Sequence, residues 1–529
     1  MSHIAEEDVS PVGFRILDLF AGPGGLDVAA HVLGHEVTGI EWDPGACTTR
    51  RAAGMDTFRG DVRQYRAAFF PRAQVLTGGP PCQTFTVAGH GAGRRALDQV
   101  LEYIGRLHEA VRAEDQEWTK TFGVWREISE ELRRKEFRAR DVKAEKREVD
   151  ELRITKRRAI RHRLEQLGNS ADEIKQVLKA LRNPQKLPFS DDELKGLLKE
   201  FSDLNDEHNA LRDKLEELGD ERTGLVLQPL WWVIERSRRP GLEPFEAVVL
   251  EQVPAVMPVW KAYAEVLASL GYRTGTQMMH TEAFGVPQTR RRAVLMARLD
   301  KCGPSGEPLP QVPESHERYR TGGCLTGRTW AAGQPDTLPL GVPEEDVAEG
   351  AKDCWVSMEK ALARARQISP EKVHERPPYT VVSNYGTGGD PEARGRRDHD
   401  APSATITGKV SRNRLVRKGT DEDLPRFDRF TFAEAGVLQT FPVEYPWSGN
   451  DVSQQIGNAV PPRLALHVLR HVLEPELGET EARARLNKAV EDLETWKPGQ
   501  PVENRGHRHL KGHPLARMPL AVTPEASAP

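Results

Sequence analysis

The feature that most constrains the fold is a short apolar segment that runs directly into a glycine-rich turn. Residues 15–20 read RILDLF and are followed by AGPGG, residues 26–33 suit a helix, and residues 36–40 suit a second strand. A strand–helix–strand unit of about thirty residues is typical of parallel sheets. A third strand, at residues 73–76, leads into the turn GGPPC. The sequence therefore predicts an α/β fold built on a parallel sheet.

A long charged segment interrupts this pattern. Residues 95–221 are dense in Lys, Arg, Glu and Asp, and contain only two prolines. Between residues 194 and 218, leucines and Phe201 follow a three-four spacing that His208 breaks once, which predicts a coiled-coil seam. A helix at residues 128–167 is the expected antiparallel partner.

The α/β pattern resumes after this insertion, and a Gly-, Pro- and Arg-rich stretch then predicts a loop-rich second domain. Two helices follow, and the chain ends in a polar tail that we expect to be partly disordered. The predicted segments are residues 1–94 and 222–300 for the α/β domain, 95–221 for the insertion, 301–425 for the loop-rich domain, 426–476 for a returning part of the α/β domain, and 477–529 for the tail.

Composition narrows the class of protein. At 529 residues the chain is long enough for about three or four structural units. No apolar run approaches the roughly 20 residues that a membrane span needs, so we expect a soluble, cytoplasmic protein. The five cysteines form no CxxC pair, and we predict no metal site. The formal net charge of −4 gives no overall basic field, so affinity for nucleic acid must come from local patches.

Residues that follow the first strands suit a nucleoside ligand. The turn Phe20–Gly25 opens a helix, which places backbone N–H groups beside a ligand. It lacks the spacing of dinucleotide-binding motifs, yet Glu41 suits ribose hydroxyls and Asp61 could accept from an adenine amino group. These residues predict an adenosine-containing cofactor without a pyrophosphate. The alternative is a tight turn that serves packing alone.

Two strand ends carry groups for covalent chemistry. Cys82 follows two prolines at the carboxyl end of a strand, where a rigid, partly exposed thiol is a candidate nucleophile. A small buried hydrophobic residue is the alternative. Glu251 ends the apolar run AVVLE, where a partly desolvated carboxyl group can donate a proton or a hydrogen bond. An ordinary surface glutamate is the alternative.

Residues Gln288, Arg290 and Arg292 lead into another strand. Strand alternation places the two arginines on one face, where they could clamp a phosphate or a carbonyl group. A solvated strand entrance is the alternative.

Five motifs in order resemble those of the carbon-5 cytosine DNA methyltransferases, which take a methyl group from S-adenosylmethionine. These are DLFAGPGG, GGPPCQTFTVAG, LEQV, QTRRR and QQIGNAVPP. The resemblance covers residues 14–94 and 222–475. It implies a Rossmann-like S-adenosylmethionine-dependent methyltransferase domain, with residues 301–425 as a smaller target recognition domain, a helical coiled-coil insertion, and double-stranded DNA as the substrate.

The resemblance also implies a role for each matched residue. Cys82 would add to carbon 6 of a flipped-out cytosine, Glu251 would contact ring N3 and the amino group, and Arg290 would bind the carbonyl group, with Arg292 beside them. Phe20 would stack on the adenine and Trp42 would flank it. Glu41 would hold the ribose, and Asp61 would bind the adenine amino group. The full cofactor set is Phe20, Gly22, Gly24, Gly25, Glu41, Trp42, Asp61, Asn458 and Val460. The expected substrate contacts are Pro81, Gln83, Gln288, Arg397 and Arg412.

Two departures from the family pattern qualify this reading. Gln252 replaces the usual asparagine after the catalytic glutamate, and we expect activity to survive. The insertion follows the nucleophile motif, where it could contact the duplex, bind a protein partner, or be a solvated coiled coil without a role in the reaction.

The same motifs also fit two other functions. Methylation of tRNA and a catalytically silent DNA-binding homologue are the rival functions. The resemblance suits a restriction–modification or phage-defence system.

Overall fold

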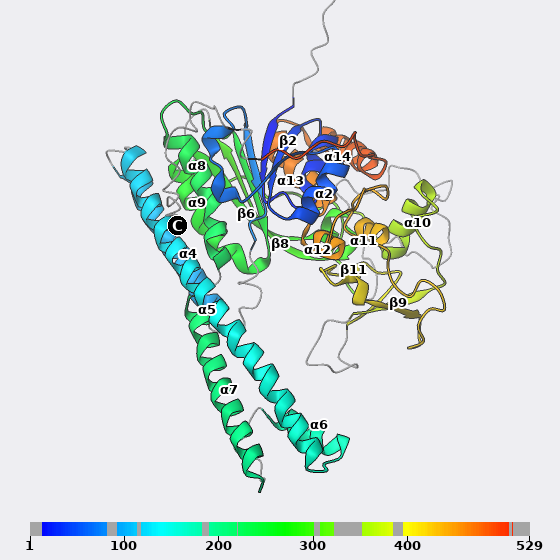
Figure 1. Ribbon diagram of the computed structural model, residues 1–529. Helices are drawn as coiled ribbons and strands as arrows, with labels where there is room; N and C mark the ends of the chain where they lie inside the picture. Colours follow the sequence, from blue (N-terminus) through cyan, green and yellow to red (C-terminus); the bar gives the residue numbers. More distant parts are fainter. Residues whose placement is uncertain are drawn as a thin grey trace, which may run out of the picture. The chain divides into compact units, whose positions relative to one another are not determined.

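The computed structural model describes residues 13–81, 92–113, 118–181, 190–218, 221–300, 307–321, 352–383, 395–506 and 510 (Figure 1). The chain divides into two compact units, which are described separately. The first comprises residues 1–81, 104–121 and 225–529, and the second comprises residues 82–103 and 122–224. Cys82 and Gln83 lie outside the described residues.

A seven-stranded sheet with the order β3-β2-β1-β4-β5-β8-β6 organises the first unit. The strands from β3 to β5 pair in parallel, whereas β8 is antiparallel to both β5 and β6. The predicted α/β class is therefore confirmed. The bounds are β1 Arg15–Leu19, β2 Glu36–Glu41, β3 Asp56–Arg59, β4 Val75–Gly78, β5 Ala247–Gln252, β6 Tyr272–His280 and β8 Arg291–Leu299.

Helices cover both faces of this sheet (Figure 1). One buried core joins the sheet to α1, α13 and α14, through residues such as Val28, Phe284 and Leu469. On the other side, α9 is anchored by Trp260, whose indole N–H donates to the carbonyl of Ala293 in β8 at 3.0 Å. The helices are α1 Gly25–Val32, α2 Pro44–Ala52, α8 Gln228–Arg238, α9 Met257–Ser269, α13 Pro462–Leu473 and α14 Glu479–Glu494.

The segment predicted as a tail contributes to the first unit. Helix α14 buries Ala489 and Leu493 in the main core, because its apolar residues recur at helical spacing. Farther on, the backbone of Arg505 hydrogen-bonds to Thr57 and Arg59, so the segment attaches to the edge strand β3 through a single β-bridge. A boundary at residue 477 therefore does not mark the end of the folded unit.

A smaller antiparallel sheet, with the order β10-β9-β12, forms a second core in this unit. Its strands β9 Tyr379–Val382, β10 Arg396–Asp398 and β12 Arg414–Arg417 pack with α10 Met358–Ile368. The same core includes α11 Phe432–Leu438 and α12 Val452–Asn458. The predicted boundary at residue 425 is thus wrong as a break in packing, since apolar residues on both sides of it share one core. A short pair joins β7 Gln288–Thr289 to β11 Ser403–Ala404.

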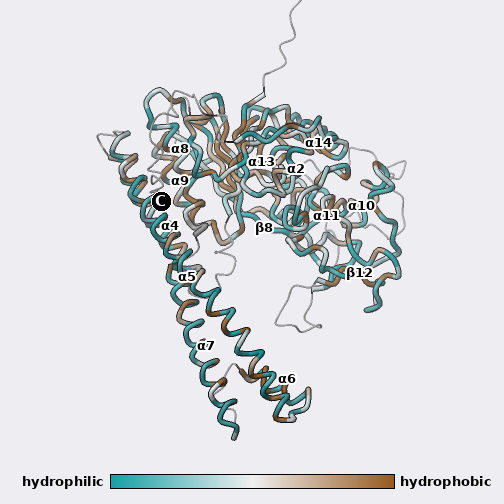
Figure 2. The backbone as a smooth tube through the Cα atoms, viewed as in Figure 1, coloured by the Kyte–Doolittle hydropathy of each residue, from teal (hydrophilic) through white to brown (hydrophobic). Residues whose placement is uncertain are grey.

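The second unit is a helical hairpin. It contains the start of α4 Ala92–Arg112, most of α5 Trp118–Gln166, α6 Ala171–Ala180 and α7 Asp192–Leu218. Its core lies between α5 and α7, in clusters such as Val142 with Leu211 and Leu164 with Leu194. Elsewhere the helices are largely hydrophilic (Figure 2).

The hairpin's limits differ from the predicted 95–221. Residues 104–121 belong to the first unit, because Leu107 and Val111 are buried and the ring of Trp118 stacks on Trp231 at 5.5 Å. Over the part of the chain that the structure describes, no helix has both the length and the apolar character needed to cross a membrane.

Candidate functional site

The turn after β1 forms a tight cradle at the carboxyl edge of the sheet. Phe20 adopts a left-handed backbone with φ of 60°, as does Gly24 with φ of 105°. A Cβ atom on Gly25 would lie 2.0 Å from the carbonyl oxygen of Val460, so the returning segment rests directly on this turn. By contrast, no atom lies within 4 Å of a Cβ position on Gly22. The cradle is therefore packed on one side and open on the other.

Glu41 links this turn to the next helix. Its carboxylate accepts from the backbone N–H of Gly22 and from that of Asp43, both at 2.7 Å. Burial raises the pKa of Glu41, while these two backbone hydrogen bonds act in the opposite direction. The neighbouring Trp42 is 63% exposed, which leaves the indole available for stacking on a ligand.

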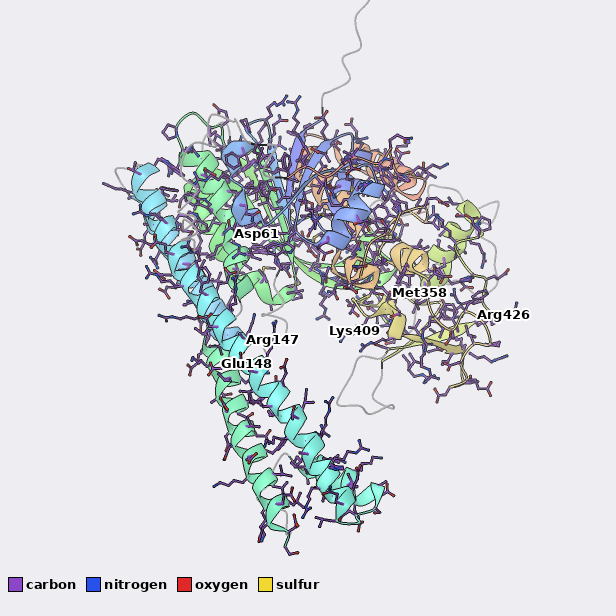
Figure 3. The ribbon with its side chains drawn as sticks, in the orientation of Figure 1. Asp61, Arg147, Glu148, Met358, Lys409 and Arg426 are labelled. Atoms are coloured by element: carbon purple, nitrogen blue, oxygen red, sulfur yellow. The ribbon has the colours of Figure 1, made fainter. Side chains whose placement is uncertain are left out.

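Asp61, labelled in Figure 3, is more strongly engaged than the sequence predicts. Its carboxylate pairs with the guanidinium of Arg63 at 2.5 Å, and it also accepts from the backbone N–H of Arg63 at 2.9 Å. The sequence reasoning missed Arg63, although an Asp two residues before an Arg at a helix start favours such a cap. An adenine amino group would have to share this carboxylate.

The end of β5 is tied to the turn that precedes Cys82. The side-chain amide of Gln252 donates to the carbonyl of Pro80 at 2.7 Å. A Cβ atom on Gly79 would lie 3.8 Å from Oε2 of Glu251, so that carboxylate stands beside the same turn. Pro81 is half-buried next to it. The residue that departs from the family pattern therefore holds the proline turn.

Glu251 and Arg292 form a nearly buried ion pair. Arg292 Nε lies 2.6 Å from Glu251 Oε1, and the two side chains are 12% and 10% exposed. Burial lowers the pKa of Arg292, and the adjacent Glu251 carboxylate opposes that shift. The pair presents a carboxylate and a guanidinium together, which suits recognition of a heterocycle edge with both donors and acceptors.

Arg290 does not join this pair. Its guanidinium is 2% exposed and donates to the carbonyls of Ile406 at 3.1 Å, Gly457 at 3.0 Å and Ala459 at 3.3 Å. Burial and the nearby Arg292 hold the pKa of Arg290 well below its usual range. Arg290 lies between β7 and β8, and its side chain turns toward the returning segment. These contacts do not support the expectation that Arg290 binds the cytosine carbonyl, because the arginine that pairs with Glu251 is Arg292.

Gln288 is also internal, and its expected contact with the substrate stays a prediction. It is fully buried, accepts from the backbone N–H of Ile406 at 2.8 Å and donates to Gln439 at 3.0 Å. Gln288 and Arg290 thus hydrogen-bond to segments around residues 406, 439 and 457 and hold them together. Strand alternation alone does not predict this role.

The returning segment closes the cradle. Asn458 is exposed at the end of α12 and accepts from Gln454 at 3.0 Å. The preceding turn of the helix is fastened to α2 by Thr49, whose hydroxyl donates to Gln455 at 2.7 Å. The sequence reasoning missed Thr49 and Gln455, because no local pattern links residues so far apart.

The two arginines expected to contact DNA differ in their surroundings. The guanidinium of Arg397 lies 4.5 Å from the ring centre of Tyr319. Arg412 is exposed at the end of a short 3-10 helix, Val410–Arg412. Their DNA contacts stay predictions, as do the roles of Cys82 and Gln83.

Comparisons with known proteins agree with this arrangement. Residues 14–105 and 246–474, more than half of the chain, match the family described as C-5 cytosine-specific DNA methylase. The gap between the two matched ranges contains most of the hairpin.

Named relatives match shorter parts of the chain. Type II methyltransferase M1.HphI of Haemophilus parahaemolyticus is 27% identical over 228 residues, 41% of this chain and 52% of the relative. Type II methylase M.HgiDII of Herpetosiphon aurantiacus is 27% identical over 259 residues, 44% of this chain and 65% of the relative. Type II methyltransferase M.AquIA of Picosynechococcus sp. is 31% identical over 113 residues, 18% of this chain and 44% of the relative. The chain thus spans less than two thirds of the length of each.

Proposed function

Because the chain belongs to the C-5 cytosine-specific DNA methylase family, we propose that it transfers a methyl group to carbon 5 of cytosine in duplex DNA. The observation that carries the proposal is the Glu251–Arg292 pair at the turn that leads into Cys82. The names of the relatives, type II methyltransferases, further support a place in a restriction–modification system.

The proposed chemistry needs a nucleophile and a group that holds the base. The Cys82 thiolate adds to carbon 6 of the cytosine, while Glu251 shares a proton with ring N3 and accepts a hydrogen bond from the amino group, which makes carbon 5 nucleophilic. Arg292 binds the carbonyl group and keeps the Glu251 carboxylate oriented. After carbon 5 has gained the methyl group, loss of its proton and elimination of Cys82 release 5-methylcytosine.

The cytosine must leave the duplex to reach these groups. Extruding a base costs a few kcal/mol, which contacts in the pocket have to offset. The nearly buried Glu251–Arg292 pair supplies charged hydrogen-bonding groups for this purpose.

The cradle after β1 fits S-adenosylmethionine as the methyl donor. Glu41 offers a buried carboxylate for ribose hydroxyls, the open side of Gly22 permits close approach, and the exposed Trp42 offers a stacking face. Phe20, Gly24, Gly25, Asp61, Asn458 and Val460 complete the proposed set. When bound, the cofactor supplies an electrophilic methyl group.

Methyl transfer to several nucleic acids tests the proposal. Labelled S-adenosylmethionine is incubated with duplex DNA or tRNA and with wild type, C82A or E251Q, and methylated DNA is then sequenced after bisulfite treatment. We expect transfer to DNA cytosines in one fixed context, and losses of at least about 100-fold in both variants. Transfer to tRNA alone would favour the RNA reading, and no transfer to either would favour a silent homologue.

A further inference from the structure

Charge is divided unevenly between the two long helices of the hairpin. Residues 133–163 of α5 contain 14 Lys and Arg against 6 Asp and Glu, whereas residues 192–218 of α7 contain 4 against 9. Part of this charge is paired across the hairpin, between Lys156 and Glu200 and between Arg163 and Asp191. These pairs neutralise only the side of α5 that faces α7.

The opposite side of α5 carries a row of basic residues, which we call the outer stripe. Arg133, Arg140, Arg147 and Arg158 fall within about 40° of one another on the helix at about 100° per residue. Val142, Val149 and Ile160 are buried on the other side of the helix. Figure 3 shows Arg147 on the side of α5 away from α7. The stripe consists of Arg133, Arg140, Lys143, Arg147, Arg158 and Arg161, all exposed.

Neighbouring carboxylates neutralise only part of the outer stripe, which therefore keeps a net positive charge. Arg140 pairs with Glu136 at 3.6 Å and Arg161 with Glu165 at 3.2 Å, but both arginine side chains are 65% exposed. Such pairs are worth only about 0.3–0.5 kcal/mol, and a stronger anion can replace them. Within the described ranges, no carboxylate lies within ion-pair distance of Arg147 or Arg158. Glu151 is a further acid on this face.

We propose that the outer stripe binds the phosphate backbone of duplex DNA, an inference that rests on the proposed function. At about 1.5 Å per residue, the stripe extends over about 42 Å, somewhat more than one turn of B-form DNA. Regularly spaced guanidinium groups suit phosphates, which position a duplex without reading its sequence. The net charge of the whole chain is −4, so this attraction is a local property of α5.

A protein partner fits this surface less well than DNA. Phe137 and Ile154 are exposed near the stripe, at 45% and 53%, but they are 17 positions apart and form no apolar patch. The core of a protein interface is depleted in charge and built from contiguous apolar residues. A row of arginines without an apolar centre therefore favours a polyanion.

Salt-dependent DNA binding by the full-length protein tests the proposal. The probe is a labelled mixed-sequence duplex of about 40 bp, followed by fluorescence anisotropy, and the variant is R140Q/R147Q/R158Q. Since each lost phosphate contact removes about 0.9 from the slope of log K against log[salt], we expect the slope to fall by about 2 to 3. We expect the Kd to rise at least tenfold at about 0.1 M salt. The single variant R147Q should lower the slope by about 1.

The matched control is K175Q/K179Q/K199Q, which removes three exposed positive charges from α6 and α7. Gln, Arg and Lys have similar helix propensities, so circular dichroism should show unchanged helix content in both triple variants. If the stripe variants retain the slope and Kd of the control, the stripe does not bind DNA, and the proposal is overturned. If wild type transfers no methyl group but the stripe variants still lose slope, the proposed function fails and this inference stands.

Discussion

At the scale of single residues, the structure separates two arginines that strand alternation treats as equivalent. Arg292 forms an ion pair with Glu251, whereas Arg290 donates hydrogen bonds to backbone carbonyls. We expect R290M to lower the free energy of unfolding by about 2–4 kcal/mol, because buried acceptors lose charged donors. The folded fraction should retain methyl transfer. In R292M, transfer should fall by at least about 100-fold in protein that is still folded.

Urea denaturation and single-turnover methyl transfer distinguish these roles. If R290M were as stable as wild type but failed to transfer methyl groups, Arg290 would belong to the reaction after all.

The raised pKa of Glu41 predicts that the stability of the folded protein depends on pH. Its pKa is raised in the folded state by burial, so the folded protein holds this proton more tightly than the unfolded chain does. Its contribution to stability is therefore largest below the unfolded value of about 4.3, and is lost as pH rises through the folded pKa. We expect E41Q to gain thermal stability over wild type progressively above about pH 4.5.

E41Q should also bind S-adenosylmethionine more weakly, by calorimetry at neutral pH. The melting temperatures of E41Q and wild type are compared from about pH 4.5 to 7. If their difference stays constant over this range, ionisation of Glu41 does not destabilise the folded protein.

At the scale of elements, the sequence predicts the central strands well, together with the motifs that follow them. The first two strands and the helix between them lie within one residue of their predicted ends, because an apolar run followed by a glycine turn admits few alternatives. Helix α14 shows the limit of that reasoning. Its apolar residues are separated by many charged ones, and it packs on a core that includes residues more than 400 positions earlier, such as Val28.

The helix α14 yields a stability prediction. Leu493 is 2% exposed in the main core, so L493A should cost about 2–4 kcal/mol of unfolding free energy, measured by urea denaturation. E479A, at an exposed position of the same helix, is the control and should change little. Equal stability of the two variants would mean that residues 477–506 are not part of the folded unit.

At the scale of the whole molecule, the motifs predict which residues lie at the carboxyl edge of the sheet better than they predict the hydrogen-bond partners of those residues. The cradle, Glu251 and the proline turn occupy the sheet edge that the sequence predicts. The sequence does not predict the hydrogen-bond partners of Gln288 and Arg290, because these partners lie more than 100 residues away, on segments whose approach no local pattern encodes. The DNA contact that we propose for the hairpin likewise depends on the face of α5 on which the basic residues lie, which follows from the fold.

The central claim, a covalent Cys82 intermediate on cytosine, is tested most directly with duplex DNA in which 5-fluorocytosine replaces cytosine. Fluorine at carbon 5 cannot leave as a proton, so the Cys82 adduct should persist through denaturing electrophoresis. It should require S-adenosylmethionine, and mass spectrometry should place it on the peptide that contains Cys82. No adduct, or an adduct that C82A still forms, would contradict this account.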